Sequence, residues 1–156
     1  MTARTTLLAI AMALSLAALS LAAPAHAAWR VVGPGMAVAE ARSGKASLAA
    51  ECLGDGLVLG IYNKVWDFDH AAPLTLIVDG TAFTVHQYGS GDRILLSDAD
   101  SAGGNLDISA KLRAALKSGR EAHLEGPVVG HLDQHEITFG LHGSEKAINT
   151  VERFCK

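Results

Sequence analysis

Short apolar segments separated by glycine-containing turns are the feature of this sequence that most constrains its fold. The clearest case is Asp79-Gly80, which separates the apolar segments 73–78 and 82–88. An Asp-Gly pair favours the positive φ angles of a tight type I′ turn between antiparallel strands. Gly54-Asp55-Gly56 separates two further strand-like segments in the same manner. Because parallel strands need longer crossover connections, these turns predict a largely antiparallel sheet.

Alternating and periodic apolar residues predict the other elements. Further strands are expected at 29–32, 36–41, 47–52, 57–62, 93–96, 120–125 and 135–142, and helices at 106–117 and after Ser144. Asn105 or Asp107 is expected to cap the first helix, Gly119 to stop it, and Ser144 to cap the second. The fold class predicted is α+β: a mostly antiparallel sheet or sandwich of seven to nine strands with two short helices.

Residues 1–27 have the order of features found in cleaved signal peptides. Arg4 is the only charged residue in this segment, the run 7–23 is apolar or weakly polar, and Ala25-His26-Ala27 offers small side chains for cleavage. A membrane span needs about 20 strongly apolar residues, and this run is shorter and rich in alanine. We expect cleavage after Ala27, no stable membrane anchor afterwards, and export to the periplasm or the medium.

The remaining segment, 28–156, has a length that suits one domain with one hydrophobic core. The whole chain has a net charge of −3, and the segment 28–156, which lacks Arg4, has a net charge of −4. A mildly acidic domain offers no electrostatic surface for nucleic acid. The sequence also contains no dinucleotide or P-loop fingerprint, so no cofactor is expected.

Cys52 and Cys155 are the two cysteines of the chain. In an exported protein an even number of cysteines favours a disulfide, and an intermolecular bond is the alternative. The intramolecular bond would close a loop of about 100 residues and contribute roughly 4–5 kcal/mol by restricting the unfolded chain. Neither cysteine belongs to a C-x-x-C motif, so redox catalysis is not indicated.

Four features give the chain a recognisable layout: Trp29 at its start, Cys52 at the end of an early strand, the Asp79-Gly80 turn, and Leu-x-Gly-Ser with a final Cys in 141–155. This layout resembles small exported bacterial proteins of poorly characterised families, distantly similar to the invasion-associated locus B proteins and the type VI secretion-associated TagO-like proteins. The chain lacks the additional cysteines of many such proteins. The resemblance implies a non-enzymatic envelope protein and assigns no residue a role.

The late histidines and nearby acidic residues are the first candidates for a metal site. If 120–125 and 135–142 form a hairpin in which Glu125 pairs with Glu136, His123 lies opposite Thr138. His142 is then about 13 Å further along, too far to share one ion with His123. The hypothesis that remains is a small site at the hairpin end made by His131 with Glu125 or Glu136, and the alternative is a solvated surface.

Asp98 and Asp100 open a second candidate, because Asp98-Ala99-Asp100-Ser101-Ala102-Gly103 matches the first half of a calcium loop. Ala102 and Ser109 stand where an EF-hand needs an oxygen ligand and a bidentate glutamate. Weak calcium binding and a simple polar loop are therefore the two interpretations. Asp67, Asp69 and His70 form a further, weaker acidic group.

Nucleophilic catalysis has little support. Ser90, in Gly89-Ser90-Gly91, lacks the Gly-x-Ser-x-Gly elbow, and a set of Ser90, His86 and Asp92 rests only on residue types. We therefore expect no enzyme, and a non-catalytic envelope protein that binds an envelope or extracellular protein or a small ligand. The alternatives are an inhibitor of a lysozyme or protease and a weak zinc- or calcium-binding protein.

Overall fold

The computed structural model describes residues 28–62, 73–98, 106–126 and 136–156. These residues form nine antiparallel strands and two helices, which confirms the predicted α+β class. The strands are β1 (Arg30–Gly33), β2 (Met36–Glu40), β3 (Ser47–Leu53), β4 (Gly56–Tyr62), β5 (Leu74–Val78), β6 (Thr81–Ser90), β7 (Arg93–Ser97), β8 (Glu121–Glu125) and β9 (Glu136–Gly140). The helices are α1 (Ala110–Ser118) and α2 (Ser144–Glu152).

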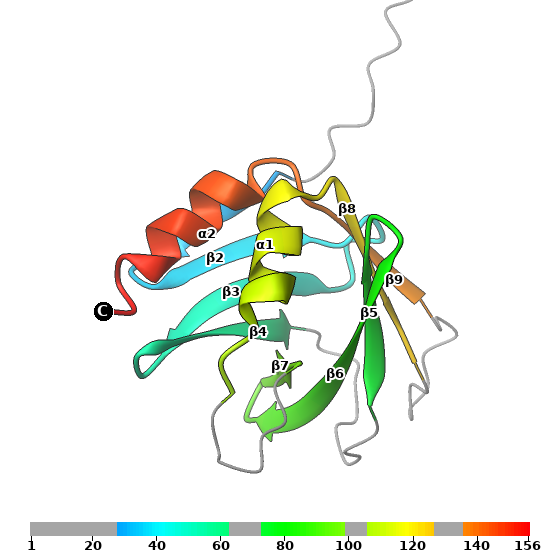
Figure 1. Ribbon diagram of the computed structural model, residues 1–156, viewed down its shortest axis with the longest axis horizontal. Coiled ribbons are helices and arrows are strands. Elements are labelled where there is room, and N and C mark those ends of the chain that lie inside the picture. Colours follow the sequence, from blue (N-terminus) through cyan, green and yellow to red (C-terminus); the bar gives the residue numbers. More distant parts are fainter. Residues whose placement is uncertain (1–27, 63–72, 99–105, 127–135) are drawn as a thin grey trace, which may run out of the picture.

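The sheet curves so that the chain just after β2 meets β9. Its strand order is β1-β2-β3-β4-β7-β6-β5-β8-β9. Beyond the end of β2, Ala41 forms a bridge with Phe139 of β9, and the backbone N–H of Arg42 donates to the carbonyl of Thr138 at 3.0 Å. Strands β2 to β9 therefore surround one interior, and Figure 1 shows the curvature of these strands. Strand β1 pairs with the edge of β2.

The concave side of this sheet contains the hydrophobic core. Alternate residues of the strands point inward, as the period of two in a strand requires. On β6, Phe83 and Val85 are buried while Thr84 and His86 are exposed. Both helices add apolar residues to the same core, among them Leu112, Leu116, Ile148 and Val151. The interior is thus filled by side chains from all layers of the fold.

The Asp79-Gly80 turn joins β5 and β6 as predicted. Asp79 has φ of 45° and Gly80 has φ of 84°, so both central residues adopt the positive φ values of a type I′ turn. The Asp79 carboxylate also accepts hydrogen bonds from the backbone N–H groups of Arg120 and Glu121, at 3.0 Å each. The turn residue therefore fixes the start of β8 beside β5.

Both helix starts differ from the prediction. Helix α1 begins at Ala110 rather than at 106, because Ser109 is its N-cap and accepts a hydrogen bond from the backbone N–H of Leu112 at 3.1 Å. The carboxylate of Asp107 is used instead by the backbone N–H of Leu57, at 2.8 Å. The prediction that Gly119 ends this helix is confirmed.

Ser144 is the first residue of α2 rather than its cap, and Gly143 with φ of 80° takes the cap position. The Ser144 hydroxyl donates to the carbonyl of Leu116 at 2.7 Å, at the end of α1. It therefore satisfies a carbonyl that has no partner within its own helix. In the described ranges, neither helix is long and apolar enough to cross a membrane.

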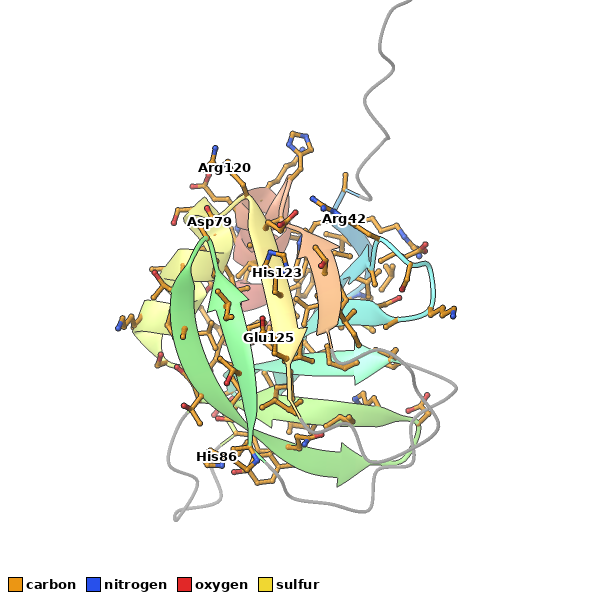
Figure 2. The ribbon with its side chains drawn as sticks, turned by 90° about the vertical axis from the view of Figure 1, so that its right-hand side faces the viewer. Arg42, Asp79, His86, Arg120, His123 and Glu125 are labelled. Carbon is orange, nitrogen blue, oxygen red and sulfur yellow. A yellow bond between two sulfur atoms is a disulfide. The ribbon has the colours of Figure 1, made fainter. Side chains whose placement is uncertain are left out.

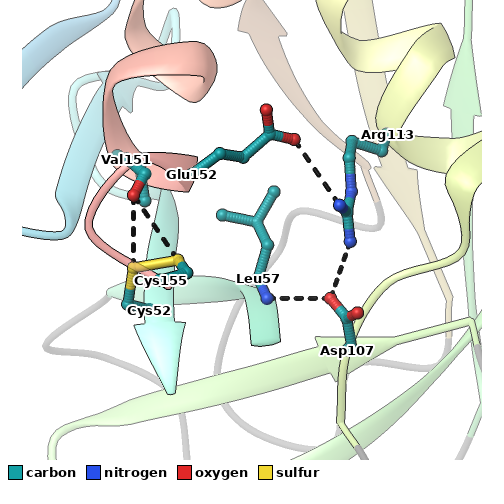
Figure 3. Close-up of a disulfide and its surroundings, with 7 residues drawn as sticks. All are labelled: Cys52, Leu57, Asp107, Arg113, Val151, Glu152 and Cys155. Carbon is teal, nitrogen blue, oxygen red and sulfur yellow. Dashed lines mark hydrogen bonds and ion pairs between the residues drawn. A yellow bond between two sulfur atoms is a disulfide. The ribbon is translucent and has the colours of Figure 1, made fainter. Parts of the chain in front are cut away.

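A disulfide joins Cys52 at the end of β3 to Cys155 after α2, as predicted, with a sequence separation of 103 residues (Figure 3). Both sulfur atoms lie close to the carbonyl oxygen of Val151, at 3.3 and 3.5 Å. A disulfide sulfur carries no proton, so these are van der Waals and dipolar contacts. The bond fastens the C-terminal helix to the sheet.

Candidate functional site

The β8–β9 hairpin has the register that the sequence predicted. Glu125 pairs with Glu136, and His123 pairs with Thr138. The His123 ring is held on both sides, with Nδ1 3.1 Å from the Thr138 hydroxyl and Nε2 2.7 Å from a carboxylate oxygen of Glu121. Both ring nitrogens of His123 therefore contact neighbouring side chains on the outer face of the sheet.

The structure places only part of the predicted metal site. Glu125 lies exposed at the end of β8, while His131 lies outside the described residues. Within the described ranges, no group of three or more His, Cys, Asp or Glu side chains is arranged to hold a metal ion. Zinc or calcium binding at the hairpin end thus stays a prediction.

Asp98 has a structural role at the start of α1. Its carboxylate accepts hydrogen bonds from the backbone N–H of Ser109, at 2.7 Å, and from the Ser109 hydroxyl. Asp100, like Asp67, Asp69 and His70, lies outside the described residues. The calcium-loop interpretation is therefore untested, but both oxygens of Asp98 are already used by the polypeptide.

The strand geometry bears on the set of Ser90, His86 and Asp92 that was considered for nucleophilic catalysis. His86 and Ser90 both belong to β6 and are four residues apart, which is about 13 Å along a strand. In the register, His86 pairs with Ser97 and Ser90 pairs with Arg93. The Asp92 carboxylate lies 3.8 Å from the guanidinium of Arg93. These positions do not bring a serine, a histidine and an aspartate into one site.

Two surface hollows meet at Arg120 and His142. One, of about 400 Å³, lies between the start of β8 and the end of β9, and its lining also includes Arg42, Asp79 and Glu121. The other, of about 390 Å³, extends from Arg120 to the start of α2. Arg42, Asp79 and Arg120 lie at the same end of the molecule in Figure 2.

Some charged side chains around these two hollows are bonded within the protein, whereas Arg120 is almost fully exposed. Asp79 accepts backbone hydrogen bonds, and Glu121 forms an ion pair with Arg42. The Arg120 side chain is 92% exposed, and its Nε lies 3.9 Å from Asp79. An ion pair this long and exposed is weak. Arg120, together with the exposed His142, can therefore contact an acidic group from outside.

A third hollow, of about 420 Å³, lies beside the disulfide and has a network of charges along it. Arg113 bridges Asp107 at 2.8 Å and Glu152 at 3.6 Å (Figure 3). Lys117 also contacts Glu152, at 2.7 Å. These pairs connect α1 to α2 and to the segment before α1. The charged side chains of this network therefore pair with one another, and the pairs hold the two helices together.

A cluster of Glu51, Tyr62 and Arg93 was not identified from the sequence. Leu48 and Ala50 of β3 face the core. Because side chains alternate along a strand, Glu51 lies on the outer face, yet it is only 7% exposed. Its carboxylate lies 3.1 Å from Nε of Arg93, and the Arg93 guanidinium lies 5.9 Å from the centre of the Tyr62 ring. One acidic residue within an apolar strand was the available sequence signal.

Electrostatics make this cluster unusual. Burial raises the pKa of Glu51, although the charge of Arg93 and a hydrogen bond from Tyr62 act in the opposite direction. Burial, together with the Glu51 carboxylate, raises the pKa of Tyr62 to about 12, so Tyr62 keeps its hydroxyl proton. The cluster therefore holds one carboxyl group whose proton affinity is increased by its surroundings.

The fold and the surface together define an α+β protein with a closed antiparallel sheet and one disulfide. No protein-family model, no curated protein and no solved structure matches this chain. The similarity to the invasion-associated locus B and TagO-like proteins consequently stays a prediction.

Proposed function

We propose that this chain is a non-catalytic, exported protein of the cell envelope that binds a partner protein or small ligand on its outer surface. The observation that carries the proposal is the filled interior, where strand and helix side chains share one core. A curved sheet filled in this way offers its outer surface for recognition.

Export is supported by two independent features. Residues 1–27 have the order of a signal peptide, with cleavage predicted after Ala27. The Cys52–Cys155 disulfide fits an oxidising compartment such as the periplasm or the medium.

The two hollows that share Arg120 and His142 are the proposed contact surface. Arg120 presents an exposed guanidinium, which can form two parallel hydrogen bonds with a carboxylate. The partner is accordingly expected to offer an acidic side chain or a carboxyl terminus at this point.

The test uses the mature chain as bait in an envelope extract of the producing cell. A double variant, Arg120→Glu with His142→Glu, should lose most of the retained partner, because it places like charges opposite the expected carboxylate. Lys111→Glu is the matched control, since Lys111 is an exposed cation on α1 that packs over Phe83 and lines neither hollow. The control should retain the partner.

Retention of the same partner by the double variant would show that this surface is not the contact. Turnover of a supplied substrate by the purified protein would contradict the non-catalytic assignment.

A further inference from the structure

The Glu51 carboxylate lies across a gap that Gly60 leaves in the outer face of the sheet. Glu51 pairs with Val58 of β4. Tyr62, four residues further along β4, pairs with Arg93 of β7. A Cβ atom at Gly60 would overlap Oε1 of Glu51. The absence of that atom lets the carboxylate extend over β4 and reach Arg93.

This ion pair is desolvated but incompletely bonded. The side chain of Glu51 is 9% exposed and that of Arg93 is 25% exposed. Among the described residues, Oε1 of Glu51 and Nε of Arg93 have no hydrogen-bond partner with acceptable geometry. A buried charge without its full set of hydrogen bonds is costly, so the site favours the neutral form of the carboxyl group.

Arg93 already lies within ion-pair distance of a second carboxylate. The carboxylate of Asp92, in the turn between β6 and β7, is 3.8 Å from the Arg93 guanidinium and is 81% exposed. Tyr62, on β4, supplies a ring beneath the guanidinium in its present position. In the described part of the chain, the charged and titratable groups that act on Glu51 are Arg93, Tyr62 and Asp92.

We propose that Glu51 is a proton-binding switch: when its carboxylate takes up a proton as the pH falls, Arg93 leaves it and keeps Asp92, at the exposed β6–β7 turn, as its acidic partner. Protonation adds one proton to Glu51 and removes the charge that holds Arg93 over β4. The positive charge of Arg93 is then directed to the exposed turn. An exported protein meets the pH of its surroundings, so this change occurs without any other ligand.

The switch is tested on the folded wild-type mature chain by nuclear magnetic resonance, from about pH 8 to about pH 4, a range that spans the ordinary carboxyl pKa. The carboxyl carbon of Glu51 should titrate with a midpoint above the ordinary 4.5. The Nε–H signal of Arg93 should shift with the same midpoint. A titration midpoint of Glu51 at or below 4.5 would overturn the proposal. An Arg93 signal that does not change with the Glu51 titration would also overturn it.

Glu51→Gln imitates the protonated carboxyl group. Its Arg93 signal near pH 8 should match that of the wild type at low pH, and should no longer respond to the Glu51 transition. Glu40→Gln is the matched control, since Glu40 forms an ion pair of the same length, 3.1 Å, with Arg30 but is exposed. In that variant Arg93 should titrate as in the wild type. If Glu51→Gln and the wild type give the same Arg93 signal near pH 8, Glu51 does not hold Arg93.

The pH dependence of the free energy of unfolding of the same variants tests the raised pKa of Glu51 independently. Because its pKa is raised in the folded state, Glu51 binds its proton more tightly when folded than when unfolded. The wild type should therefore lose free energy of unfolding relative to Glu51→Gln as the pH rises from the unfolded pKa through the folded pKa. Glu40→Gln should show no such trend.

Discussion

Gly60 is the single residue on which the Glu51 cluster depends. A methyl group at this position would meet the Glu51 carboxylate, and its carbon would lie 3.4 Å from the Tyr62 ring. The strand thus tolerates a glycine, at some cost in backbone entropy, because the side chain of a neighbouring strand occupies the space.

Gly60→Ala should therefore destabilise the protein by about 1–3 kcal/mol, the usual range for inserting a methyl group into a packed site. In the background of Glu51→Ala the same substitution should cost much less, since the obstructing carboxylate is gone. Chemical denaturation of the four proteins in this cycle measures the difference. An equal cost in both backgrounds would mean that Glu51 does not occupy the gap.

At the scale of the elements, Ser144 connects the two helices. Its buried hydroxyl donates to the Leu116 carbonyl, so the end of α1 and the start of α2 share one hydrogen bond. The exposed hydroxyl of Ser118 donates to Ala114 in a similar way, but within one helix.

Ser144→Ala should lower the free energy of unfolding by about 1–3 kcal/mol, because it leaves a buried carbonyl without its donor. Ser118→Ala should change it by less than about 0.5 kcal/mol, since water replaces the lost donor at an exposed site. Thermal unfolding of both variants tests this contrast. Equal effects would indicate that the helix–helix hydrogen bond adds nothing.

The β8–β9 hairpin places two glutamates, Glu125 and Glu136, directly opposite each other. Like charges in this position are unfavourable by a few tenths to about 1 kcal/mol. Glu125→Gln should therefore stabilise the metal-free protein by a similar amount.

The same pair tests the metal hypothesis. If a divalent cation binds at the hairpin end, millimolar zinc or calcium should raise the melting temperature of the wild type more than that of Glu125→Gln, because a ligand of the folded state stabilises it. Glu145→Gln, an exposed carboxylate on α2, is the control. Equal responses of all three proteins would exclude Glu125 as a ligand.

At the scale of the whole molecule, the disulfide links two distant parts of the chain. It joins residues 103 positions apart and fastens α2 to β3. Replacement of Cys52 and Cys155 by alanine should lower the free energy of unfolding by about 4–5 kcal/mol, because the unfolded chain regains the freedom of a long loop. Denaturation with and without a reductant measures the effect in the wild type.

Intact mass of the exported protein checks the bond and the processing together. The chain should begin at Ala28 and weigh two hydrogens less than its reduced form. A retained N-terminal segment would contradict cleavage after Ala27, and free thiols would contradict a disulfide in the exported protein.

Local chemistry determined much of this fold from the sequence alone. The Asp79-Gly80 turn and the pairing of Glu125 with Glu136 were both predicted correctly. Each depends on residues near one another in the chain, through turn conformation and the period of two in a strand. The cysteine pairing was predictable because two cysteines allow only one intramolecular bond.

The tertiary structure decided the rest. The helix starts were wrong because Asp107 and Ser144 bond to β4 and to α1, rather than to the helices that follow them. The meeting of Ala41 with Phe139, and of Glu51 with Arg93, joins residues far apart in sequence. Such contacts follow from how the sheet curves and packs, which no local pattern encodes. The sequence therefore determined the elements and their turns, and packing determined the closed sheet and its buried charge.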